Sequence, residues 1–227
     1  MAANFMTDFD FSKLNNYVAG GALLPSPDQY VGELIVEENQ LLFTFHQRDT
    51  IDYIDDDYVF LSGNEYHEKN ILVVLESPHR FEYDSNNKPV GLAMGKTGEN
   101  FFNLFTLALQ KSFLSMKNGS YNVILTNAVQ YQTSCGLNPI DRKLRDKNWL
   151  DIYDNFGGEK DFKKRIYTIK PRYTFNLCTG GRNPEGLRQK VNKSLIDFKL
   201  IKGKHFTEGN HPASWNLHGD TKNAKIY

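Results

Sequence analysis

Four short apolar runs in the chain each end in a cluster of polar, glycine or proline residues. The runs ILVV, VIL and YTFNL precede LESPHR, TNAVQ and CTGGR, within 71–80, 123–130 and 173–182. A fourth, less apolar run, KHFTEG, precedes NHPAS within 204–214. Apolar runs bounded in this way are typical of strands. Since ligands of open parallel sheets bind beyond the carboxyl ends of the strands, the pattern predicts one crevice with four contributing strand ends.

Helical periodicity lies between these runs. Apolar residues recur at helical spacing after the first run, which predicts a helix over 101–113 with Thr97 as its N-cap. A second helix is predicted over 141–153. A third is predicted to begin at Asn183 and Pro184, because proline suits the first helical turn. Strands that alternate with helices indicate a parallel sheet with crossover helices, and so an α/β fold.

The first part of the chain has a different pattern. It holds a short amphipathic stretch (11–18), a predicted hairpin (33–45) and an acidic run (52–57), which we interpret as a solvated loop. We therefore expect an N-terminal extension over 1–69, packed on an α/β domain over 70–227. A chain of 227 residues with ordinary apolar content can bury one such core, which favours a single globular unit.

Composition excludes several classes of protein. Because 27 Lys and Arg balance 27 Asp and Glu, nucleic-acid binding would need a local basic patch rather than a basic total. Two cysteines, Cys135 and Cys178, are too few for a disulfide framework, a four-cysteine zinc site or an iron–sulfur cluster held by four thiolates. No signal peptide and no run of about 18 apolar residues is present, so we expect a cytoplasmic protein without a membrane span.

The segment GLAMGKTG (91–98) shares some features with a phosphate-binding loop. Its spacing differs, because three residues rather than four separate Gly91 from Gly95, and no strand precedes it. No apolar strand ends in an aspartate that would hold magnesium, so a nucleotide hydrolase is disfavoured. Backbone amides near Lys96, at a helix start, can still receive a phosphate of a nucleic-acid backbone.

Taken in order, these motifs resemble those of the uracil-DNA glycosylase superfamily. LESPHR is similar to the family's first motif, G-Q-D-P-Y-H or G-E-A-P-G. KPVGLAMGKTGENFFNLF is similar to the P-F-V-G-x-A-G segment and the helix that follows it in the iron–sulfur branch. ILTNAV is similar to the family's L-L-N-A-V element, and HPAS is similar to its H-P-S-P motif. The resemblance covers about 71–215. It implies a three-layer α/β/α sandwich with a central four-stranded parallel sheet, to which the N-terminal extension is added.

The resemblance implies a monofunctional DNA glycosylase, which flips a nucleotide out of the helix and hydrolyses the bond between base and sugar. Cleavage builds positive charge on the sugar and negative charge on the base. At the matching positions, Glu76 would support the cationic sugar and position water, while His211 stabilises the leaving base. Asn127 would read the base edge, since an amide offers both a donor and an acceptor. No lysine matches a Schiff-base position, so we expect an abasic product without strand nicking, metal or cofactor.

The resemblance also implies residues around the base and the DNA. We expect a base pocket formed by Ser77, Pro78, His79, Gly91 and Met94. We expect DNA contacts from Lys96, Thr97, Gly180, Arg182, Ser214 and Trp215. Trp215 follows the last motif, where the family carries a leucine wedge, and two interpretations stay open for it: stacking on DNA bases, or packing in its own loop.

The chain also departs from the family pattern. Ser77 replaces the water-activating aspartate of the best-known branch, and the iron–sulfur cysteines are absent. Met94 is the nearest match to the phenylalanine that stacks on the base. With His79, these differences favour a pocket for a modified pyrimidine, such as a modified cytosine in phage DNA, over plain uracil. The role would then be antiviral defence or DNA repair, with the protein acting as a monomer. The alternative is a superfamily member that has lost catalysis and binds DNA or a nucleotide through the same crevice.

Overall fold

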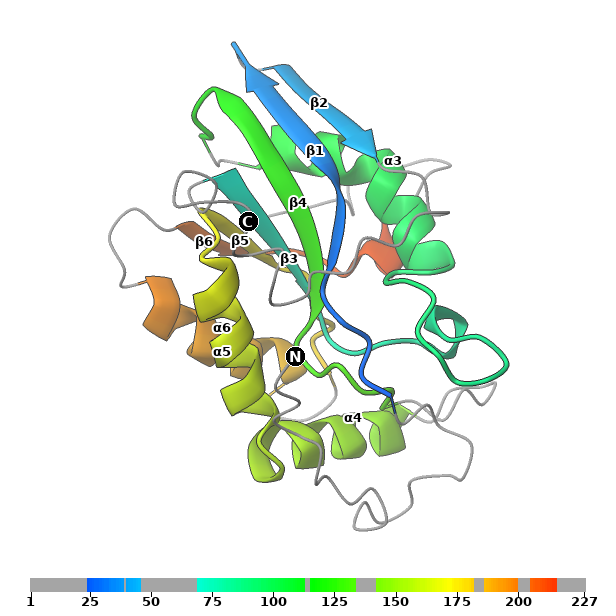
Figure 1. Ribbon diagram of the computed structural model, residues 1–227. Coiled ribbons are helices and arrows are strands. Elements are labelled where there is room, and N and C mark those ends of the chain that lie inside the picture. Colours follow the sequence, from blue (N-terminus) through cyan, green and yellow to red (C-terminus); the bar gives the residue numbers. More distant parts are fainter. Residues whose placement is uncertain are drawn as a thin grey trace.

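The computed structural model describes residues 24–38, 40–45, 69–112, 115–133, 142–181, 186–199 and 205–215. Its strands are β1 (Gln29–Glu37), β2 (Gln40–Phe45), β3 (Asn70–Leu75), β4 (Gly119–Asn127), β5 (Tyr173–Asn176) and β6 (His205–Glu208). Its helices are α3 (Lys96–Gln110), α4 (Arg142–Leu150), α5 (Gly158–Ile169) and α6 (Leu187–Lys199). Three short helical turns complete it: η3 (Arg80–Glu82), η4 (Asp151–Asn155) and η5 (Pro212–Ser214). The predicted α/β class is confirmed (Figure 1).

The sheet has six strands in the order β2-β1-β4-β3-β5-β6, where the sequence predicted four parallel strands. The four predicted strands are present as β3 to β6 and run parallel to one another. The predicted hairpin is also confirmed, but its first strand begins at Gln29 and pairs antiparallel along β4 as far as Gly119. This pairing makes the sheet mixed, because the hairpin joins the sheet edge instead of packing on a face.

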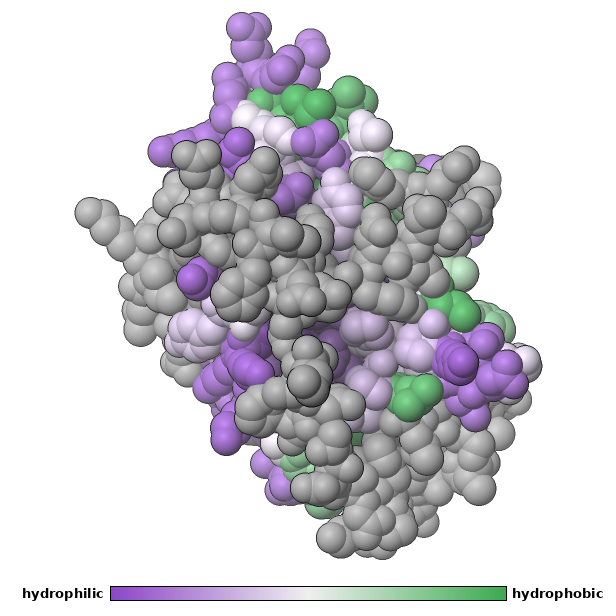
Figure 2. Space-filling model, viewed as in Figure 1, coloured by the Kyte–Doolittle hydropathy of each residue, from purple (hydrophilic) through white to green (hydrophobic). Residues whose placement is uncertain are grey.

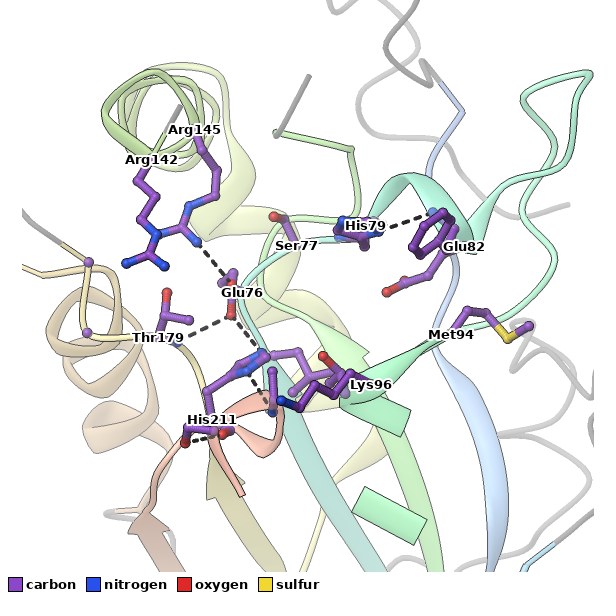
Figure 3. A pocket seen from close by; sticks show the side chains of 18 residues that line it. Glu76, Ser77, His79, Glu82, Met94, Lys96, Arg142, Arg145, Thr179 and His211 are labelled. Atoms are coloured by element: carbon purple, nitrogen blue, oxygen red, sulfur yellow. Dashed lines mark hydrogen bonds and ion pairs between the residues drawn. The ribbon is translucent and has the colours of Figure 1, made fainter. Parts of the chain in front are cut away.

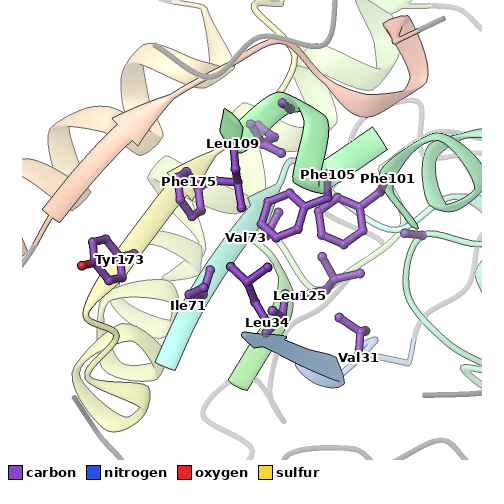
Figure 4. Packing of buried hydrophobic residues seen from close by; sticks show 14 of the residues in the cluster. Val31, Leu34, Ile71, Val73, Phe101, Phe105, Leu109, Leu125, Tyr173 and Phe175 are labelled. Atoms are coloured by element: carbon purple, nitrogen blue, oxygen red, sulfur yellow. The ribbon is translucent and has the colours of Figure 1, made fainter. Parts of the chain in front are cut away.

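Alternating side chains of the central strands build two cores. All six residues of β3 are buried. Ile71 and Val73 face one apolar cluster, which Phe101 and Phe105 of α3 complete (Figure 4). Leu72 and Val74 belong to a second cluster that includes side chains of α4, α5 and α6. Since successive residues of a strand point to opposite faces, helices cover both faces of the sheet.

The helices differ from the predicted ones at their ends. α3 begins at Lys96 and its N-cap is Gly95, in a positive-φ conformation that suits glycine, so Thr97 as N-cap was wrong. The helix predicted over 141–153 is divided into α4 and the π-helical turn η4. α5 was not predicted at all. The predicted start of the third helix, at Asn183, lies outside the described residues, and α6 follows it.

The described surface is mostly hydrophilic in the view of Figure 2, and apolar side chains gather near the β1–β2 end of the sheet. Leu42 and Phe45 of β2 are exposed at 61% and 37%. Among the described helices, none combines the length and apolar character needed to cross a membrane. The amphipathic stretch at 11–18 and the acidic run at 52–57 lie outside the described residues.

Candidate functional site

A cavity of about 660 Å³ opens beyond the carboxyl ends of β3, β5 and β6 (Figure 3). This volume is within the range of small-molecule sites. The start of α3 and one face of α4 complete its wall. Three of the four predicted strand ends therefore meet in one site. The fourth, at the end of β4, does not line the cavity.

Most predicted site residues line this cavity. They are Glu76, Ser77, Pro78, His79, Met94, Lys96, Thr97, Gly180, His211 and Ser214. Asn127, Gly91 and Trp215 do not line it. Arg182 lies outside the described residues. Sequence reasoning missed five side chains of the wall that bear on its chemistry: Phe81, Glu82, Arg142, Arg145 and Thr179.

Contacts of both its backbone carbonyl and its carboxylate hold Glu76 in place. Its carbonyl accepts a hydrogen bond from Nε1 of the buried Trp149 at 2.7 Å. Its Oε2 lies 3.3 Å from the backbone nitrogen of Thr179, which donates to it, and 3.3 Å from Nε2 of His211. Its Oε1 is 3.6 Å from Nη1 of Arg145. The carboxylate thus joins side chains or backbone from three separate elements at the cavity wall.

The Nε2 of His211 faces the Glu76 carboxylate at 3.3 Å. Its Nδ1 accepts the backbone N–H of Ala213 at 3.2 Å, so the neutral ring carries its proton on Nε2, towards Glu76. Burial lowers the pKa of His211; Glu76 acts in the opposite direction, and Arg145 and Arg188 add to the lowering. The imidazole is therefore neutral at neutral pH and suited to stabilising a developing negative charge.

The wall of the cavity is basic on two sides. Lys96 and Thr97 line it at the N-terminus of α3, where the helix dipole is positive. Arg142 and Arg145 line it from α4. Their spacing of three residues within a predicted helix placed them on one face, so the sequence did contain a signal for this pair. Figure 3 shows both arginines directed towards Glu76.

Glu82 carries its carboxyl to the cavity wall although its residue is only 4% exposed. Burial raises the pKa of Glu82 to about 8, and the nearby Glu76 contributes to this rise. The rise is opposed by hydrogen bonds from the backbone of His79 and Ala93 and from the amide of Asn127. The carboxyl is therefore protonated at neutral pH. Its Oε2 has no hydrogen-bond partner among the described residues. Nothing in the sequence distinguishes this glutamate from a solvated one.

Asn127 is fully buried at the end of β4. Neither Nδ2 nor Oδ1 makes a hydrogen bond of ordinary geometry with the described residues, although the amide lies close enough to Glu82 to influence its pKa. Its backbone carbonyl accepts a hydrogen bond from Nη2 of Arg165 at 3.0 Å. The predicted base-reading amide therefore lies beside Glu82 and not on the cavity surface.

An aromatic side chain stands at the cavity beside His79. The Nδ1 of His79 accepts the backbone N–H of Phe81 at 3.3 Å, and the two rings are 4.8 Å apart. Burial lowers the pKa of His79, against the effect of Glu76, so this ring is also neutral at neutral pH. Phe81 is 67% exposed and lines the cavity, which leaves its ring free to contact a planar ligand.

Trp215 packs inside the protein. Of the two interpretations left open by the sequence, this agrees with packing in its own loop and not with stacking on DNA bases. Its residue is 1% exposed, and its ring lies 6.5 Å from that of Phe101, nearly parallel. Its Nε1 donates to the carbonyl of Asn210 at 3.0 Å. Gly91 is likewise buried behind the wall, next to Gln29 and Met94. As placed, neither residue contacts a ligand in the cavity.

Within the described parts of the chain, no group of three His, Cys, Asp or Glu side chains is arranged to hold a metal ion. No protein-family model, curated protein or solved structure matches this chain. The relationship to the uracil-DNA glycosylase superfamily thus stays a prediction. Any functional conclusion has to come from the cavity itself.

Proposed function

We propose that this protein is a monofunctional DNA glycosylase of the uracil-DNA glycosylase superfamily, with a three-layer α/β/α core extended by the N-terminal hairpin. One observation carries the proposal: a carboxylate and a neutral imidazole, Glu76 and His211, lie 3.3 Å apart in a cavity with basic walls. Cleavage of a base–sugar bond needs a negative group near the sugar and a donor near the base. The parallel order β4-β3-β5-β6, with helices on both faces, supports the fold.

In the proposed reaction, the flipped nucleotide binds in the cavity beside Glu76 and His211. The bond between C1′ and the base nitrogen breaks, and its electron pair leaves with the base. The Nε2–H of His211, released from Glu76, donates a hydrogen bond to the departing base. Glu76 then stabilises the cationic sugar and accepts a proton from the water that adds to C1′. The departing base anion takes up a proton from solvent, and Glu76 later returns its own to solvent. The products are a free base and an abasic site, as expected from the sequence.

A modified pyrimidine is the substrate class that we propose. Ser77, His79 and Met94 line the cavity at the positions where the sequence departs from the family pattern. The Ser77 hydroxyl is engaged by Thr133 at 2.7 Å, and Met94 is a flexible side chain that packs against many shapes. A modified cytosine in phage DNA fits this description. Efficient excision of uracil, and of no modified base, would contradict it.

The test is to incubate the protein with DNAs that contain uracil, hypoxanthine, xanthine, hydroxymethylcytosine or glucosylated hydroxymethylcytosine. Abasic sites are then detected by alkaline cleavage. We expect product from at least one DNA, and a loss of about 10²-fold or more with Glu76→Gln, because a group that stabilises transition-state charge contributes that much. Glu37→Gln is the matched control, since Glu37 is exposed at the far end of β1.

The second candidate is a DNA- or nucleotide-binding module without catalysis. The engagement of Glu76 by Arg145, His211 and the Thr179 backbone favours it, because a carboxylate held by three partners is less available to water. The two candidates differ in the panel experiment. A binding module gives no abasic sites from any DNA, yet retains affinity for it.

A further inference from the structure

Two buried polar side chains lie together on one side of the cavity. Glu82 lines it, and the amide of Asn127 lies behind Glu82, close enough to act against the rise of its pKa. Oε2 of Glu82 makes no hydrogen bond of ordinary geometry with the described residues, and neither amide atom of Asn127 does so. Both residues are at least nine-tenths buried, and the carboxyl of Glu82 is directed into the cavity (Figure 3). Buried polar groups are nearly always hydrogen-bonded, so an incompletely bonded carboxyl at a cavity wall points to a ligand that completes it.

We propose that the Glu82 carboxyl reads the edge of the flipped base, and that Asn127 is a positioning residue that orients this carboxyl from behind. This inference rests on the proposed glycosylase function and assigns the base-reading contact within it. Glu82 lines the cavity, whereas Asn127 does not. The sequence motif thus identified the correct side of the pocket but not the side chain that faces the base.

A neutral carboxyl suits this task because it presents one donor and one acceptor side by side. The N3–C4 edge of a pyrimidine also offers one of each. Cytosine has an acceptor at N3 and a donor at N4, and uracil has a donor at N3 and an acceptor at O4, so either edge can form two parallel hydrogen bonds. An ionised carboxylate can only accept, and would leave one atom of the edge unsatisfied.

Charged or titratable groups from several elements share the cavity with Glu82. Glu76 at the end of β3 disfavours ionisation of Glu82. Lys96 of α3, Arg142 and Arg145 of α4, and His211 before η5 also line the cavity. His79 lies on the segment that carries Glu82 itself. Because several of these groups titrate or carry charge, the test compares two proteins that differ only at Glu82.

The experiment uses the DNA that the wild-type protein cleaves best. Glu82→Met keeps the length of the side chain but removes both polar atoms, and we expect excision to fall by about 10²-fold or more, since a site built for hydrogen bonds rejects an unmatched partner strongly. Glu82→Gln keeps a donor and an acceptor and is always neutral, so it should restore excision to within about tenfold. Above pH 8 the wild type should lose about tenfold per pH unit, and Glu82→Gln should not.

Two results would overturn the inference alone: full activity of Glu82→Met, or a Glu82→Gln protein as inactive as Glu82→Met, which would indicate an ionised carboxylate. A second measurement needs no variant. Methylation of the excised base at N3 blocks the proposed edge, so excision by wild type should stop, and continued excision would contradict the inference. If the wild-type protein makes no abasic sites from any DNA, that result contradicts the proposed function itself, and with it the assignment of Glu82.

Discussion

Glu82 makes the stability of the protein depend on pH. Its carboxyl titrates near 4.5 in the unfolded chain and at about 8 in the folded protein. Folding therefore takes up a proton between these values; the stabilisation is complete below pH 4.5 and is lost as the pH rises through 8. We expect the free energy of unfolding to fall by roughly 1.4 kcal/mol per pH unit from this residue. Urea unfolding between pH 5 and 9 measures it.

Glu82→Gln is the matched comparison for this prediction. Glutamine stays neutral in both states, so the variant should lack the decrease and be more stable than wild type at pH 9. The partly buried His79 and His211, whose pKa values are lowered, affect stability at the acid end in both proteins and cancel in the difference. Parallel curves for the two proteins would contradict the assignment of a protonated Glu82.

The position of a single residue at the cavity was predictable where a recognisable motif at a strand end surrounded it. Glu76 and His211 each precede or follow a proline motif at a strand end, and both line the cavity. Glu82 and Phe81 were missed, because a glutamate or phenylalanine in a loop gives no sign of whether it will be buried. Asn127 and Trp215 have the expected neighbours along the chain, but their side chains turn inward, and only tertiary packing decides that direction.

At the scale of elements, the His211 turn depends on α3 for its position. Nδ2 of Asn100, buried on α3, donates to the carbonyls of Pro212 at 2.9 Å and Trp215 at 2.7 Å. Asn100→Ala removes both of these hydrogen bonds, and the Pro212 carbonyl keeps only the backbone N–H of Trp215, so we expect a loss of about 1–3 kcal/mol in stability. Turnover should fall while DNA affinity is retained, because His211 moves and the basic wall does not.

Asn103→Ala is the control for this experiment. Asn103 lies on the same helix, and its Nδ2 donates only to the carbonyl of Glu99, at an exposed position. Chemical denaturation and single-turnover excision are measured for both variants. Equal effects of the two substitutions would show that α3 does not position the turn.

Arg165 connects α5 to the sheet. Its Nη1 donates to Asp28, just before β1, at 2.8 Å, and its Nη2 donates to the carbonyls of Asn127 and Ala128. Burial raises the pKa of Asp28, and Arg165 opposes that rise. Arg165→Met leaves Asp28 buried without its cation, so we expect a loss of about 3–5 kcal/mol. Adding Asp28→Asn should recover part of it, which a double-mutant cycle detects; simple additivity would contradict the pairing.

The elements were predictable to the extent that their apolar pattern was unambiguous. The four parallel strands follow from short apolar runs, and each is present. α5 was not predicted, although Phe162, Ile166 and Ile169 are buried at helical spacing. The charged residues between them resemble those of a solvated connecting segment. The start of α3 was misplaced, since a positive-φ glycine caps it through backbone conformation and not through a side chain.

For the whole molecule, the charge distribution predicts how the proposed DNA binding responds to salt. The chain has zero net charge, yet Lys96, Arg142 and Arg145 gather at the cavity. Each neutralised phosphate contributes a slope of about −0.9 to the dependence of log affinity on log salt. Arg142→Gln should therefore reduce the slope by about 1, measured by fluorescence anisotropy in the Glu76→Gln background. Lys147→Gln, an exposed change elsewhere on α4, should leave the slope unchanged.

The global architecture was predictable in class but not in the extent of its sheet. Alternation of strands and helices indicated an α/β fold with parallel strands. Pairing of the hairpin with β4 joins segments that are distant in the chain, and local pattern does not specify which edge a hairpin will join. For the same reason, four converging strand ends were predicted, while the fold brings three of them to the cavity.

The order of the strands has a consequence for a chain emerging from the ribosome. β4 lies between β1 and β3, so the hairpin has no place in the sheet until β4 has been synthesised. β6 is added last, and the imidazole of His211 follows it. The nascent chain thus contains Glu76 well before it contains His211. A partly translated chain therefore lacks the Glu76–His211 pair, which forms only after the last strand has joined the sheet.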